Sequence, residues 1–178
     1  MNNSLKALLL AFCAMLFCPQ VCYSQKDLEY DAIDKFDKNI RNRTTKGFYL
    51  NKGSAKYDLV KMWINCKSGP NLENKEYTIN IFMLGYNVGN IEQGFTLDFL
   101  LNDDNIVTLR AKQNYHLIQT GYGSKVQAEY SITETDLNKL LHNGVKYIRY
   151  QNSSGTVECA VKPKRSKNMQ EVINSIIP

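Results

Sequence analysis

The stretch Phe95–Ala111, FTLDFLLNDDNIVTLRA, carries the clearest structural signal in this chain. Apolar side chains fall on every second residue on both sides of the central NDDN, at Phe95, Leu97, Phe99 and Leu101 and then at Val107, Leu109 and Ala111. A period of two is typical of a strand with one buried face. Asn and Asp tolerate the tight backbone angles of a short turn. The stretch therefore predicts an antiparallel β-hairpin.

The same period of two continues on both sides of this hairpin. In Lys56–Cys66, KYDLVKMWINC, one face holds Val60, Met62, Ile64 and Cys66. The run Tyr77–Leu84 is almost wholly apolar, as expected for a central strand. Further strands are predicted at Tyr115–Thr120, Val126–Ile132, Val145–Gln151 and Thr156–Lys162, joined in pairs by the turns GYGS and NSSG.

Three segments have helical spacing instead. Thr133 is a good N-cap, Asp136 stands at the third helical position and Gly144 follows the apolar stripe, which predicts a short capped helix near residues 133–143. At the end of the chain, one helical face collects Met169, Val172, Ile173, Ile176 and Ile177, which predicts an amphipathic C-terminal helix. Asp27–Arg43 also has roughly helical apolar spacing and predicts a third, N-terminal helix.

These elements predict a mainly β fold on the borderline of the α+β class. Hairpin-connected strands followed by two late helices favour an antiparallel β-sandwich or roll. Residues 25–178 are of ordinary length for a single domain, and no linker divides them. We expect one β-rich domain.

The late part of the chain resembles the ending of small exported proteins of unknown function found in Bacteroidetes. The resemblance covers roughly the last third of the chain, SITETDLNKLLHNGVKYIRYQNSSGTVECAV at Ser131–Val161 and the basic segment after it. It is one of pattern and brings no catalytic residues with it. It implies export and a similar architecture.

The beginning of the chain has the layout of a signal peptide. Lys6 precedes the apolar run Leu8–Phe17, which is half the roughly 20 residues that span a bilayer. Cys22 and Ser24 supply small side chains before a cut, so residues 1–24 are predicted to be removed, leaving a chain that begins at Gln25. This predicts a periplasmic or secreted protein without a membrane span.

Lipid attachment is the alternative interpretation of this segment. It requires a small residue directly before a cysteine, whereas bulky residues precede Cys13, Cys18 and Cys22. The signal peptide is therefore the preferred interpretation.

Most of the net charge of +5 is concentrated at one place in the sequence. Four basic residues lie within six at KPKRSK, namely Lys162, Lys164, Arg165 and Lys167, and the rest of the mature chain is balanced. This pattern disfavours nucleic-acid binding, which needs a broad basic face. The segment is either a solvated connector or a contact for a polyanionic partner.

The mature chain retains two cysteines, Cys66 and Cys159, each on the predicted buried face of a strand. In an oxidising compartment they predict a disulfide. The alternative is two separate buried thiols that behave as small apolar groups. His116 and His142 lie on other elements without the short spacings of a zinc site, so neither a metal nor another cofactor is expected.

Trp63 lies on the strand face opposite Met62 and Ile64. If that face is exposed, Trp63 with Tyr57 is placed to stack on a sugar or to anchor a protein partner; otherwise another layer covers it. Together these patterns predict an exported, non-catalytic module that binds an unknown envelope protein or glycan. The alternatives are a small periplasmic hydrolase using His116 with an acidic residue, and a structural subunit held by its edge strands.

Overall fold

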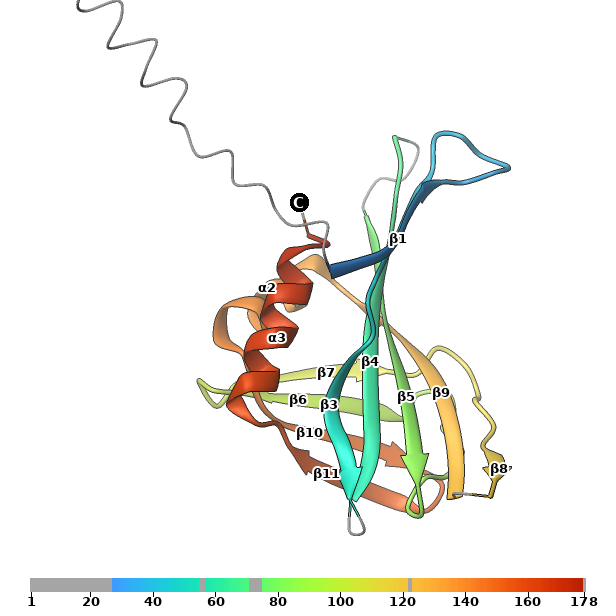
Figure 1. Ribbon diagram of the computed structural model, residues 1–178, viewed down its shortest axis with the longest axis vertical. Coiled ribbons are helices and arrows are strands. Elements are labelled where there is room, and N and C mark those ends of the chain that lie inside the picture. Colours follow the sequence, from blue (N-terminus) through green and yellow to red (C-terminus); the bar gives the residue numbers. More distant parts are fainter. Residues whose placement is uncertain (1–26, 55–56, 71–74, 122, 178) are drawn as a thin grey trace, which may run out of the picture.

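The computed structural model describes residues 27–54, 57–70, 75–121 and 123–177, which form two antiparallel sheets and two helices (Figure 1). The strands are β1 (Leu28–Ile33), β2 (Arg41–Thr45), β3 (Phe48–Ser54), β4 (Tyr57–Ser68), β5 (Glu76–Gly85), β6 (Thr96–Leu101), β7 (Ile106–Arg110), β8 (Ile118–Thr120), β9 (Gly123–Ile132), β10 (Val145–Asn152) and β11 (Gly155–Ala160). The helices are α2 (Glu134–Asn143) and α3 (Pro163–Asn174). The predicted mainly β, sandwich-like fold with two late helices is confirmed.

The large sheet has the order β1-β2-β4-β5-β9-β8, and β3 also pairs with β4. Because β3 pairs with the first half of β4 and β2 with its second half, these two strands share one edge of β4. The small sheet has the order β11-β10-β6-β7. Its strands run across those of the large sheet, and α2 and α3 lie together on one side of the two sheets (Figure 1).

The core lies between the two sheets. The large sheet buries one face of β4, β5 and β9, and the small sheet buries one face of β6, β7 and β10. The largest fully buried side chains include Tyr130, Tyr150, Phe99, Met62, Ile64, Ile79, Ile81, Met83, Leu97 and Leu101. Burial of this apolar surface is the dominant favourable term in folding, and it leaves the alternate side chains of both sheets facing outward.

The β6–β7 hairpin forms as predicted. Leu97 pairs with Leu109 and Phe99 with Val107, so both inward faces meet on one side of the small sheet. In the turn, Asp104 has a positive φ of 68°, a conformation that Asp adopts more readily than most residues. The hairpin places β6 beside β10, where the candidate site forms.

Helix α2 begins and ends as the sequence predicts. The Thr133 hydroxyl accepts a hydrogen bond from the backbone N–H of Asp136 and donates one to its carboxylate. The hydrogen bond from Lys139 lowers the pKa of Asp136 despite partial burial, and the bond from Thr133 lowers it further. At the other end, Gly144 has φ 65° and its N–H donates to the Leu140 carbonyl.

Helix α3 confirms the amphipathic helix predicted at the end of the chain. Met169, Val172 and Ile173 are buried on one face. The buried hydroxyl of Ser166 accepts a hydrogen bond from the backbone N–H of Val145 at 2.7 Å, which joins α3 to the start of β10. The helix therefore closes one side of the core.

The predicted helix over Asp27–Arg43 is wrong. This segment forms β1, a tight loop and β2, which pair with each other and then with β4. In the loop, the Asp34 carboxylate accepts hydrogen bonds from the backbone N–H groups of Phe36 and Asp37, so the side chain stabilises a turn where a helix was expected. Pairing of β2 with β4 stabilises the extended conformation more than the helical spacing of apolar residues stabilises a helix.

The predicted disulfide is absent: Cys66 and Cys159 are buried and are not bonded to each other. Cys66 projects from β4 of the large sheet, where its sulfur lies 3.6 Å from Nη2 of Arg43. Cys159 belongs to β11, an edge strand of the small sheet. The alternative of two separate thiols in the core describes them correctly.

The predicted leader, residues 1–24, lies outside the described residues, as do the lipid-attachment alternatives Cys13, Cys18 and Cys22. Neither described helix is both long and apolar enough to cross a membrane.

Candidate functional site

The outer face of the small sheet carries an ordered set of side chains in cross-strand rows. One row is apolar and contains Tyr147, Leu100 and Ile106 from three adjacent strands. The next row is charged or polar and contains Glu158, Arg149, Asp98 and Thr108. Since side chains alternate across a strand, the same strands bury Leu97, Phe99 and Ile148 on the inner face.

The charged row is held together by Asp98. Its Oδ1 accepts a hydrogen bond from the Thr108 hydroxyl at 2.8 Å. Its Oδ2 lies 2.9 Å from Nε and 2.8 Å from Nη2 of Arg149. The Asp98 side chain is only 10% exposed, whereas the Arg149 side chain is 47% exposed. Asp98 therefore fixes the orientation of a guanidinium group whose remaining edge faces solvent.

A hollow of about 230 Å³ lies where the apolar and charged rows meet. It is lined by Asp98, Leu100, Ile106, Tyr147, Ile148, Arg149 and Glu158. Ile106 and Tyr147 are among the large apolar side chains most exposed on the small sheet, at 55% and 47%. The hollow combines exposed apolar walls with a preoriented charged group, as binding sites commonly do.

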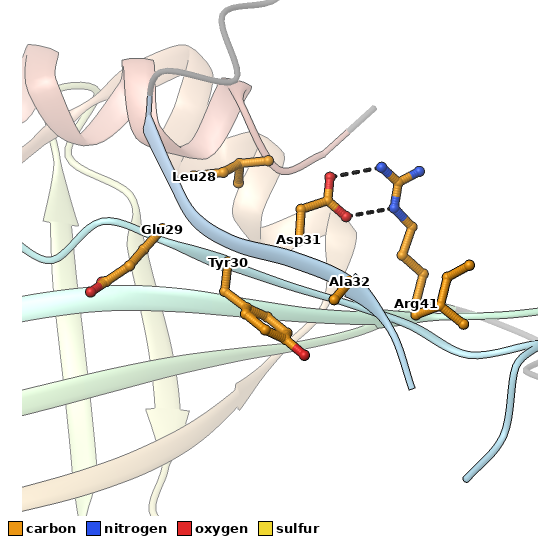
Figure 2. Close-up of a pocket in the computed structure, with 7 residues that line it drawn as sticks. Leu28, Glu29, Tyr30, Asp31, Ala32 and Arg41 are labelled. Carbon is orange, nitrogen blue, oxygen red and sulfur yellow. Dashed lines mark hydrogen bonds and ion pairs between the residues drawn. The ribbon is translucent and has the colours of Figure 1, made fainter. Parts of the chain in front are cut away.

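A second hollow, of about 570 Å³, runs along the edge strand β1 (Figure 2). Asp31 points toward Arg41, and two hydrogen bonds of 2.6 and 2.7 Å join them, while Tyr30 points to the opposite side of the strand (Figure 2). These bonds lower the pKa of Asp31 and raise that of Arg41. Asp31 and Arg41 neutralise each other in this ion pair. The groove along the edge strand β1 therefore offers a ligand no unpaired charge from these two residues.

A third hollow, of about 580 Å³, lies where β5 and β9 approach the start of α2. It is lined by Lys75, Glu76, Tyr77, Thr78, Lys112, Ser131, Ile132, Thr133, Glu134 and Thr135. The Tyr77 hydroxyl lies 3.3 Å from the Glu134 carboxylate and 3.4 Å from the carbonyl oxygen of Ile177. Burial raises the pKa of Tyr77, so this hydroxyl stays protonated and ties α2 and the end of the chain to the large sheet.

No family model, curated protein or solved structure matches this chain. The resemblance of its last third to exported Bacteroidetes proteins stays a prediction from the sequence pattern. The geometry of the described residues is therefore the basis for a proposed function.

Trp63, predicted as a binding residue, lies on the outer face of the large sheet opposite Asn80 of β5. It is half-buried. Two amide atoms on the same face, Nδ2 of Asn80 and Oδ1 of Asn65, are closed off from solvent without a hydrogen-bond partner among the described residues. A ligand would reach them only if a side chain moved. The side chain of Tyr57 lies outside what the structure describes.

The basic segment lies at the start of α3, with Lys162 as the N-cap residue. Lys162, Lys164 and Lys167 are exposed. Arg165 is half-buried, and its Nη1 donates a hydrogen bond to the Leu50 carbonyl of β3 at 3.0 Å. Arg165 thus joins α3 to the large sheet, and only the lysines are freely displayed.

The basic segment and Trp63 cannot form one site. Helix α3 packs with Met169 and Ile173 in the core, on the inner side of the large sheet. Trp63 lies on the outer side of that sheet. The two predicted contacts are therefore separate surfaces.

The residues considered for chemistry are not assembled into a cluster. His116 is exposed between β7 and β8 and forms no ion pair with the acidic side chains that the structure describes. His142 lies in the last turn of α2. Within the described ranges, no three His, Cys, Asp or Glu side chains are grouped closely enough to hold a metal ion.

Sequence reasoning did not single out Arg149 or Tyr147. Both lie on the solvent-facing side of a correctly predicted strand, where charged and aromatic residues are common. Their signal emerges only when β10 pairs with β6, which brings Arg149 beside Asp98 across 51 positions of sequence. The sequence signal that could have indicated this site is a charged residue on the outer face of each of two alternating strands, Asp98 in β6 and Arg149 in β10.

Proposed function

We propose that this chain is an exported, non-catalytic module that binds a protein or glycan partner at the cell envelope through the outer face of its small sheet. The observation that carries the proposal is the hollow in which Arg149, held by the buried Asp98, lies beside the exposed Tyr147 and Ile106. The predicted leader supports the envelope as the compartment.

The composition of this face supports binding. Tyr and Arg are among the residue types enriched at binding hot spots. Arg149 is already oriented by two contacts to Asp98, so binding a ligand costs less side-chain entropy than ordering a free arginine. The face is thus prepared for contact before a ligand arrives.

The outer face of the large sheet is a weaker alternative. Trp63 is half-buried there, and the two unpartnered amides near it are enclosed. The small-sheet face instead presents its apolar and charged groups directly to solvent. This difference in access favours the small sheet.

Site-specific photo-crosslinking in the native host tests the proposal. A benzophenone amino acid replaces Ile106 in the full-length chain, and in the control it replaces Ile118. The two isoleucines are matched, at 55% and 58% exposed, but Ile118 lies on β8 at the edge of the large sheet.

We expect ultraviolet light to produce a defined adduct from position 106 and much less from position 118, as seen by gel shift and mass spectrometry. Adducts of equal yield from both positions, or none from position 106, would contradict the proposed surface.

A further inference from the structure

The hollow on the small sheet contains a loose ion pair whose donor and acceptor are not joined by a hydrogen bond. Nε and Nη2 of Arg149 both contact Oδ2 of Asp98, and the remaining nitrogen, Nη1, faces Glu158. The Nη1 to Oε1 distance is 3.8 Å, which is too long for a hydrogen bond. Each hydroxyl group of a ligand both donates and accepts, so adjacent hydroxyls can bond to Arg149 and Glu158 together.

The charges of the lining residues select against an anionic ligand. The hollow contains one guanidinium, from Arg149, and two carboxylates, from Asp98 and Glu158. One positive and two negative groups give the hollow a net negative charge, which repels an anionic ligand. A neutral ligand rich in hydroxyl groups avoids this repulsion.

The apolar row lies directly beside these polar groups. Tyr147 pairs with Leu100, and Leu100 pairs with Ile106. This row lies two residues along the strands from the row of Arg149 and Asp98. A sugar ring has an apolar C–H face and a hydroxyl-bearing edge. It can therefore lie against the exposed ring of Tyr147 while its edge reaches Arg149 and Glu158.

The size of the hollow limits the ligand. Its volume of about 230 Å³ is below the roughly 300–1,000 Å³ of pockets that enclose a drug-sized molecule. A single ring fits this space, with the remainder of a chain extending over the open face. The hollow thus suits one residue of a longer glycan.

From these observations we infer that the outer face of the small sheet binds one neutral sugar residue of an envelope glycan. The ring stacks on Tyr147, and adjacent hydroxyls bond to Arg149 and Glu158. This inference rests on the proposed function, because both use the same hollow.

NMR titration of the ¹⁵N-labelled protein tests the inference. The probes are methyl glycosides of glucose, galactose, mannose and N-acetylglucosamine, with methyl glucuronide and inorganic phosphate as anionic probes. At least one neutral glycoside is expected to shift the amide signals of β6, β7 and β10. The anionic probes are expected to leave them unchanged.

Substitutions at two tyrosines locate the contact. Tyr147→Ala should weaken binding about tenfold, a typical loss at an aromatic anchor, while Tyr147→Phe retains it. Tyr49→Ala is the matched control, since Tyr49 is 39% exposed on the outer face of the large sheet near Trp63. Tighter binding of glucuronide than of the neutral glycosides, or an equal loss in Tyr49→Ala, would overturn the inference.

The two proposals fail in different ways. If no neutral glycoside binds but crosslinking from Ile106 yields a protein adduct, the sugar assignment is wrong and the binding surface stands. If glycosides do not bind and position 106 yields no adduct, both proposals are overturned.

Discussion

The ion pair between Asp98 and Arg149 is the feature on which the candidate site depends, and a double-mutant cycle measures it. Asp98→Ala removes the acceptor for the Thr108 hydroxyl and for two nitrogen atoms of Arg149. Hydrogen bonds to charged groups each stabilise a protein by about 1.5–3 kcal/mol. Arg149 is 47% exposed and regains water when its partner is lost, which reduces the net effect.

We therefore expect Asp98→Ala to lower the free energy of unfolding by about 2 kcal/mol, a lowering of Tm by roughly 4–8 °C for a domain of this size. The coupling between Asp98→Ala and Arg149→Ala should be about 1 kcal/mol, because one partner is buried and the geometry is close. Urea unfolding of the wild type, both single variants and the double variant provides these values.

The matched control is the ion pair between Lys112 and Glu129. Its atoms are 3.3 Å apart, but its side chains are 46% and 39% exposed. A solvent-exposed pair of this kind couples by about 0.2–1 kcal/mol, and we expect a value at the lower end. If the coupling of Asp98 with Arg149 does not exceed that of the control pair, then Arg149 is not held in place and the argument for a preoriented site fails.

Three further predictions concern the fold. Thr133→Ala should destabilise the protein by about 1 kcal/mol through loss of the helix cap, and Thr135→Ala, at the second residue of α2, should destabilise it less. Because the pKa of Asp136 is lower in the folded protein than in the unfolded chain, its carboxylate stabilises the fold above about pH 4, and this contribution is lost as the pH falls through the folded pKa. Asp136→Asn should therefore make stability in urea less sensitive to acid, and an unchanged pH profile would contradict this. Cys66 and Cys159 should resist alkylation in the native protein, and both should react with the alkylating agent in denaturant without reductant. Intact mass measures the number of alkyl groups added. If the cysteines are alkylated only after reduction, they form a disulfide and the prediction is wrong.

Most strands could be predicted because their signals are local. Leu97 and Phe99 alternate with polar neighbours, and the turn residues between β6 and β7 suit a hairpin whatever surrounds it. The cap formed by Thr133 is equally local, since it bonds a backbone group three residues away. In these segments the local preference and the final fold agree.

The prediction for the N-terminal segment was wrong because its structure is decided by a distant partner. Leu28, Ala32 and Phe36 have helical spacing, yet the segment is set by pairing of β2 with β4, more than 20 residues further along. Short apolar periods do not distinguish helix from strand when the partner is distant. Asp34, whose side chain stabilises the turn between β1 and β2, was the residue in this segment that favoured a turn over a helix.

The candidate site could not be predicted from sequence because it depends on strand register. Tyr147 and Ile106 share a row only through Leu100 of β6, and one step of slippage would move the row to the opposite face. The sequence instead emphasised Trp63, a residue that is rare and therefore conspicuous. Composition identifies such residues, whereas access to solvent is decided by the sheets.

Crosslinking from position 106 in the presence and absence of the Arg149 side chain tests the central claim most directly. The benzophenone residue is placed at Ile106 in the otherwise unchanged chain and in the Arg149→Ala variant, with circular dichroism confirming that both are folded. If the small-sheet face binds an envelope partner through Arg149, the yield of adduct falls by roughly tenfold in the variant. An unchanged yield would show that position 106 captures molecules that are merely nearby, and the proposed binding surface would be wrong.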